Sequence, residues 1–159
     1  MKKIILLAIL ACTLATSCHV SYNSVATANN TATKFMKMDG DGSITVRAGA
    51  QGRNYNDAWD QACKRAVREI IFKGIEVPGN AFMSKPLITE VNAEEKYQDF
   101  FNVFFMDKGD YRKFVTTEDK RVGSTVETKA DAMVKQTLTI RILRAELKQY
   151  LIEHGVIKL

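Results

Sequence analysis

The chain has 159 residues, 46% of them hydrophobic, and a formal net charge of +5 at pH 7, which fits one globular domain with a conventional core. Two of the positive charges are Lys2 and Lys3, so the remaining bias is too small to indicate nucleic-acid binding. Three cysteines and two histidines are too few for a disulfide scaffold or a histidine-rich metal site.

The first eighteen residues predict an export signal that ends at a modified cysteine. Lys2 and Lys3 precede a short apolar run, residues 4–14, and small residues at Ala15 and Ser17 lead up to Cys18. The run is shorter than the ~20 residues that a membrane-spanning helix needs. Small residues directly before the cysteine suit cleavage by a signal peptidase.

This segment resembles the bacterial lipoprotein signal family, although Ala15 stands where a larger aliphatic residue is usual. The resemblance implies that residues 1–17 are a signal peptide and that Cys18 carries the lipid, with palmitate as a typical acyl chain. It also implies that the protein is anchored in the bacterial cell envelope, at the outer membrane facing the periplasm or the surface. A plain secretory signal cut near residues 26–28 and a retained anchor helix are the alternatives.

Residues 18–40 are expected to form a flexible tether, because their first part is rich in Ser, Asn, Thr and Ala and has no sustained periodicity. A single domain is expected over residues 41–159. Asp39, Asp41 and Ser43 begin like a calcium-binding loop, but Ile44 and Ala50 stand where the glycine and the bidentate glutamate belong. A turn before the first strand is therefore the favoured interpretation.

Residues 43–50 alternate apolar and polar side chains and predict a strand, which Gly49 and Gly52 are expected to end. A helix follows from Asn54 or Asn56 to about residue 73, with Gly74 as its left-handed cap. Gly49, Gly52 and Arg53 lie between strand and helix, where backbone amides can hold an anion. A tight connection without a ligand is the favoured alternative, because the motif lacks the rest of a phosphate loop.

The predicted helix has one apolar face and one basic face. Cys63 falls on the apolar face and is expected to be a buried structural thiol. Lys64, Arg65 and Arg68 form a basic strip on the other face, which we interpret as a solvated surface in preference to an anion-binding one.

Residues 76–90 contain both prolines and are expected to form a loop. A second helix is predicted over residues 92–108, with an aromatic face that includes Phe101 and Phe104. These two side chains are expected to belong to the core, and the alternative is that they form an interface for a partner or a lipid surface.

Beyond Tyr111 the pattern predicts strands over residues 112–117, 125–133 and 134–143, then a helix over 144–154 that ends at Gly155. His154 near the end of this helix is expected to pack or cap there instead of binding a metal. The order of elements predicts an α+β fold: a mainly antiparallel sheet of three to four strands with two or three helices packed on one face.

Two parts of the chain resemble a small β-α-β-β-α envelope domain, found in the N-terminal part of the flagellar periplasmic protein FlgT and in several bacterial lipoproteins. The resemblance covers residues 43–75 and 111–157, and it includes the alanines Ala58, Ala62 and Ala66 and the final Gly155-Val156. The resemblance implies a binding or assembly module without catalytic activity.

No nucleophile–base pair, metal motif or paired catalytic carboxylates can be found in the sequence. We therefore expect no enzyme activity and no cofactor, but a membrane-anchored envelope lipoprotein whose domain binds an envelope protein partner. A small-ligand or anion-binding module is the alternative function, and an enzyme using scattered carboxylates is the least favoured one.

Overall fold

The computed structural model describes residues 33–116, 125–128 and 134–158. Cys18 and the whole predicted signal lie outside this part of the chain. Within it, none of the helices combines the length and the apolar character that crossing a membrane requires.

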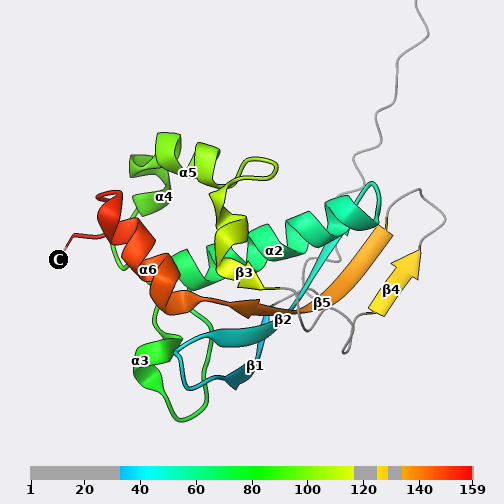
Figure 1. The fold of residues 1–159 in the computed structure, drawn as a ribbon, viewed down its shortest axis with the longest axis horizontal. Coiled ribbons are helices and arrows are strands. Elements are labelled where there is room, and N and C mark those ends of the chain that lie inside the picture. Colours follow the sequence, from blue (N-terminus) through cyan, green and yellow to red (C-terminus); the bar gives the residue numbers. More distant parts are fainter. Residues whose placement is uncertain (1–32, 117–124, 129–133, 159) are drawn as a thin grey trace, which may run out of the picture.

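An antiparallel sheet forms the centre of the fold (Figure 1). Its strands lie in the order β1 (Lys34–Met38), β2 (Ile44–Gly52), β5 (Val134–Ile142) and β3 (Val115–Thr116), and β4 (Thr125–Thr128) pairs with β5 as well. Helices cover one face, so the predicted α+β class is confirmed.

The core lies between the sheet and α2 (Tyr55–Phe72), which contacts β2 and β5. The register pairs Ile44 with Ile142 and Val46 with Ile140, and all four side chains are buried. Because side chains alternate between the two faces of a strand, this register places the apolar set of both strands on one face. The intervening positions carry the polar residues that the alternation predicted.

β1 corrects the predicted boundary between tether and domain. Lys34 to Met38 fall within the range 18–40 that was assigned to the tether, yet they pair with β2 from Arg47 to Ile44. The pattern was hard to recognise because β1 is an edge strand with mostly exposed side chains. The sheet therefore begins before residue 41.

The ends of α2 follow the prediction. The side chain of Asn54 accepts a hydrogen bond from the backbone N–H of Asp57 at 2.9 Å, which satisfies one of the free donors of the first turn. At the other end Gly74 has φ +78° and its N–H donates to the carbonyl of Glu69. Ile75 then turns into the core, as expected for a left-handed helix ending.

The single helix predicted over residues 92–108 is wrong in one respect. It is divided into α4 (Ala93–Lys96) and α5 (Gln98–Phe104), because Tyr97 has φ −109° and ψ 32°, outside the helical range. The predicted loop over residues 76–90 contains only the one-turn α3 (Ala81–Ser84). Figure 1 shows α4 and α5 next to α6 at one end of α2, with α3 beside β1 and β2.

The predicted strand over residues 112–117 is mostly a 3-10 helix, η2 (Asp110–Phe114), followed by the two residues of β3. Tyr111 and Phe114 of η2 are both buried. They are three residues apart, and a 3-10 turn places residues at that spacing on the same side. The last helix, α6 (Arg144–Glu153), ends before Gly155 at φ +68° as predicted.

Candidate functional site

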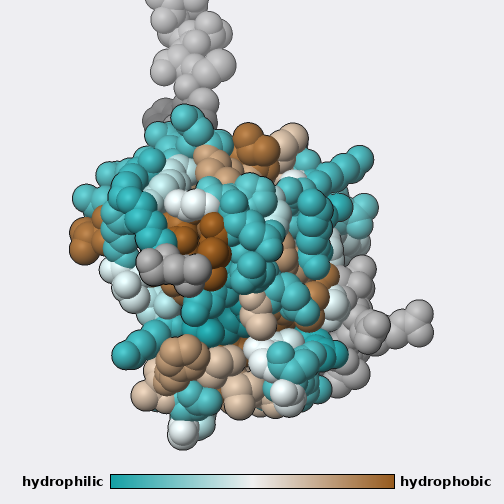
Figure 2. Space-filling view, turned by 60° about the vertical axis from the view of Figure 1, so that its left-hand side comes forward, coloured by the Kyte–Doolittle hydropathy of each residue, from teal (hydrophilic) through white to brown (hydrophobic). Residues whose placement is uncertain are grey.

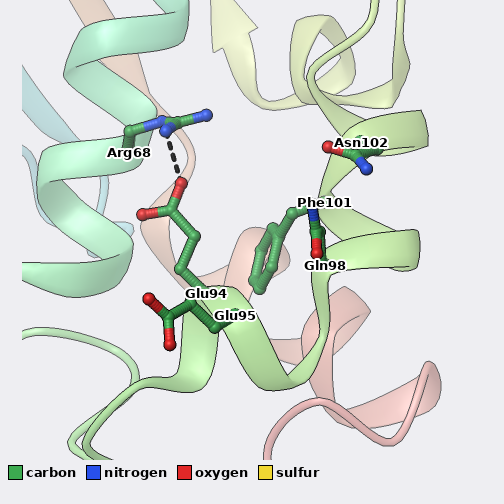
Figure 3. Close-up of a pocket in the computed structure, with 6 residues that line it drawn as sticks. All are labelled: Arg68, Glu94, Glu95, Gln98, Phe101 and Asn102. Carbon is green, nitrogen blue, oxygen red and sulfur yellow. Dashed lines mark hydrogen bonds and ion pairs between the residues drawn. The ribbon is translucent and has the colours of Figure 1, made fainter.

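An open pocket of about 620 Å³ lies between α2, α4 and α5. Arg68 comes from α2, two acidic residues come from α4 and the rest of the wall comes from α5. Figure 3 shows the six lining residues, which are Arg68, Glu94, Glu95, Gln98, Phe101 and Asn102. Because three helices contribute, the pocket exists only in the folded domain.

Local helix geometry explains how these side chains converge. Glu94 and Glu95 lie in the first turn of α4, where carboxylates are favourable beside the exposed N–H groups. Gln98 and Asn102 are four residues apart in α5, so both amides lie on the same side of that helix. The neighbouring Phe101 is buried and forms the apolar part of the wall.

The pocket keeps a negative charge and free hydrogen-bonding groups. Arg68 pairs with Glu94, and its guanidinium lies 4.7 Å from the centre of the Phe105 ring. Glu95, Gln98 and Asn102 have no side-chain hydrogen bond to any described residue. The pocket can therefore receive hydrogen-bond donors and a positive charge from another molecule.

The structure favours a tight connection over an anion site at Gly49, Gly52 and Arg53. The strand does not end at Gly49, which pairs with Thr137, but continues to Gly52. A Cβ atom at Gly52 would lie 2.2 Å from the backbone nitrogen of Ala58, so this glycine allows the close approach of α2 to the sheet.

The chain's own carboxylate occupies the place that an anion would take. Asp57 accepts hydrogen bonds from the backbone N–H and from Nε of Arg53, at 2.9 and 3.2 Å. These bonds, the backbone one first, hold the pKa of Asp57 below its usual value. The favoured alternative, a tight connection without a ligand, agrees with this geometry.

Phe101 and Phe104 are 3% and 1% exposed and belong to the core. The interface alternative is therefore wrong for Phe104, while Phe101 reaches the surface as part of the pocket wall. Their rings pack edge to face, with centroids 6.4 Å apart, and Phe104 also stacks with Phe114. The exposed apolar residues of this segment are Val103 and Met106, which one-face periodicity did not single out.

A charged cluster that the sequence did not reveal lies between α2 and η2. The Tyr111 hydroxyl donates to Oδ1 of the buried Asp60. Arg112 Nε donates to the same oxygen at 3.1 Å, and Lys64 Nζ lies 3.1 Å from Oδ2. Burial opposes ionisation of Asp60, but these three partners together lower its pKa.

The same cluster raises the pKa of Tyr111, through burial first and the Asp60 hydrogen bond second. Tyr111 is therefore held as a neutral donor to a carboxylate, which stabilises the fold and leaves neither group free for proton transfer. Asp60 and Tyr111 are 51 positions apart, so no local motif could have indicated their contact.

Carboxylates of neighbouring residues pair with all three cations of the basic strip predicted on α2. Arg68 is exposed to solvent as predicted, whereas Lys64 and Arg65 are only partly exposed. Lys64 also pairs with Asp107 at 2.7 Å, Arg65 with Glu69 at 3.2 Å, and Arg68 with Glu94. The buried Cys63 beside the strip agrees with the predicted structural thiol.

The turn at Asp39, Asp41 and Ser43 is held by a side chain of the sheet. Arg141 Nη2 donates to Asp41 at 2.6 Å and Nε donates to the Ser43 hydroxyl at 2.8 Å. Hydrogen bonds from Ser43 are the main reason that the pKa of Asp41 falls to about 2. The described residues contain no group of three or more His, Cys, Asp or Glu arranged for a metal ion.

His154 does pack at the end of α6, as expected. Its ring lies 4.0 Å from the centre of the Tyr150 ring, and Nδ1 lies 2.8 Å from the Tyr150 carbonyl oxygen.

Comparisons of the chain with protein-family models, with curated proteins and with solved structures gave no match. The resemblances to the lipoprotein signal family and to the FlgT domain stay predictions.

Proposed function

We propose that this protein is a lipid-anchored lipoprotein of the bacterial cell envelope, at the outer membrane, with a non-catalytic binding domain. The carrying observation is the order of two lysines, a short apolar run and small residues before Cys18. Two acyl chains hold a soluble domain on a membrane lastingly, since each buried methylene contributes about 0.8 kcal/mol. The compact domain that follows would then act next to the membrane surface.

Within this domain, the pocket between α2, α4 and α5 is our candidate for partner binding. Glu95 contributes a carboxylate, and Gln98 and Asn102 contribute amide groups that the described chain leaves without partners. These groups are exposed, so a partner protein replaces their water contacts, and an ion pair at such a position contributes up to about 1 kcal/mol. A basic side chain of an envelope protein fits this arrangement.

The anchor is tested by fractionating cells that produce the chain with Cys18→Ala. We expect the unchanged chain in the membrane fraction and the variant in the soluble fraction. Ser17→Ala is the matched control, because it keeps the cysteine and a small residue before it. Equal membrane association of Cys18→Ala and the unchanged chain would contradict the anchor.

Partner binding is tested by crosslinking in intact cells. Glu95→Lys should remove the specific crosslinked species, because it reverses the charge of the pocket wall. Glu76→Lys makes the same change at an exposed position outside the pocket and should leave the species in place. Loss of the species in both variants, or in neither, would contradict binding through this pocket.

A further inference from the structure

A second, smaller cavity of about 170 Å³ lies at the start of α6, away from the pocket described above. It is bounded by α3, by the segment that follows α3 and by the first turns of α6. Its lining residues are Phe82, Lys85, Pro86, Leu87, Thr89, Arg144 and Lys148. Three of these side chains are cationic, and none is acidic.

Arg144 is the centre of this arrangement. It is only 7% exposed, although an arginine is rarely buried so far unless a carboxylate pairs with it. Its Nη2 donates to the backbone carbonyl of Lys85 at 2.9 Å, and Nη1 lies 3.7 Å from the Met83 sulfur. Both acceptors are neutral, so the positive charge is not compensated by a carboxylate among the described residues.

The position of Arg144 in its helix adds to this excess of positive charge. It is the first residue of the ten-residue α6, and the preceding Leu143 provides no side-chain cap. A cation at a helix N-terminus is unfavourable, because the free N–H groups already carry partial positive charge. Glu146 in the first turn is exposed and does not line the cavity. Burial without an anionic partner also lowers the pKa of Arg144.

The remaining wall is mostly apolar. Phe82, Pro86 and Leu87 contribute its apolar part, Thr89 is the one polar residue, and Phe82 is 68% exposed at the rim. At the level of α3, the lower part of Figure 2 shows moderately hydrophobic surface between hydrophilic side chains. The volume corresponds to roughly six water molecules at about 30 Å³ each, so only a small group fits inside.

From the buried cation, the two flanking lysines and the apolar wall, we infer that this cavity binds a small amphipathic carboxylate, an anionic group on a short hydrocarbon chain. The planar guanidinium of Arg144 matches a carboxylate, and the charges of Lys85 and Lys148 attract the anion to the cavity. The hydrocarbon part of the ligand packs on Phe82 and Leu87. This inference is independent of the function proposed for the larger pocket.

The test is a titration followed by two-dimensional amide NMR, with hexanoate as the probe and the full chain carrying Cys18→Ala. Hexanoate should shift the amide signals of residues 85, 87–89 and 144–148 with a dissociation constant on the order of 1 mM, as suits so few atoms. Acetate carries the charge without the chain, and hexanamide carries the chain without the charge. Both should bind at least several-fold more weakly.

The variant Lys85→Glu with Lys148→Glu leaves the buried Arg144 in place and should weaken hexanoate binding on the order of tenfold. Lys108→Glu, at an exposed position outside the cavity, is the matched control and should leave binding unchanged. Circular dichroism verifies that each variant is folded. The inference is overturned if hexanoate shifts no signal of these residues, if hexanamide binds equally well, or if the double variant binds as the unchanged chain does.

Discussion

The buried contact between Tyr111 and Asp60 allows a quantitative test of the fold. Tyr111→Phe removes only the hydroxyl that donates to Asp60, while Arg112 and Lys64 still contact the carboxylate. A hydrogen bond to a charged group contributes about 1.5–3 kcal/mol, and both members of this pair are buried. We therefore expect the free energy of unfolding to fall by about 2 kcal/mol.

Tyr150 provides the matched control, because its hydroxyl also donates to an aspartate, Asp110, at 2.6 Å. Asp110 is 44% exposed in its side chain, so water replaces much of the lost bond and Tyr150→Phe should cost only about 0.5–1 kcal/mol. In urea denaturation followed by circular dichroism, with m near 2 kcal/mol per M, Tyr111→Phe should lower the midpoint by about 1 M. Equal midpoint shifts for the two variants would refute the buried contact between Tyr111 and Asp60.

Three further changes test other parts of the structure. Gly52→Ala should destabilise the domain by more than about 2 kcal/mol in urea denaturation, since the new Cβ would meet the backbone of α2. The control Gly40→Ala, with open space around it, should be neutral or slightly stabilising, and similar urea midpoints for the two variants would contradict this packing. Phe104→Ala should lower the free energy of unfolding by about 3–5 kcal/mol because the ring is buried. The control Val103→Ala, at a 65% exposed site, should lower it by less than about 0.5 kcal/mol, and an equally small effect of Phe104→Ala would contradict its place in the core. Asp41 has a pKa of about 2 in the folded chain against about 3.9 when unfolded, so its contribution to stability is present above about pH 4 and is lost as the pH falls towards 2. Asp41→Asn should therefore make the urea midpoint fall less steeply between pH 4 and pH 2, and an unchanged pH dependence would contradict the turn geometry.

The local parts of the fold could be predicted from the sequence. Two candidate caps, Asn54 and Asn56, predicted the start of α2 and Gly74 predicted its end, and the structure shows Asn54 as the cap. Alternation predicted β2 and β5, because capping and side-chain periodicity depend only on neighbouring residues. The edge strand β1 and the break at Tyr97 were missed. An exposed edge strand has little hydrophobic alternation to recognise, and a helix interrupted at one residue keeps most of its aromatic periodicity.

The sites depend on contacts between distant positions, which one sequence does not reveal. Arg68 was seen as part of a basic strip, but its partner Glu94 lies 26 positions away and on another helix. Arg144 looked like an ordinary first residue of a helix, and only the fold shows it buried against the carbonyl of Lys85. The less favoured alternative, an anion site at Gly52 and Arg53, is not formed, because Asp57 accepts the hydrogen bonds that Arg53 would offer to a ligand.

We propose that the mature protein is held on a membrane by lipid at Cys18. Mass spectrometry of the N-terminal peptide from the protein purified from membranes tests this proposal. We expect a peptide that begins at Cys18 and carries the mass of a diacylglyceryl group with acyl chains such as palmitate. A peptide that begins at another residue, or an unmodified Cys18, would contradict it.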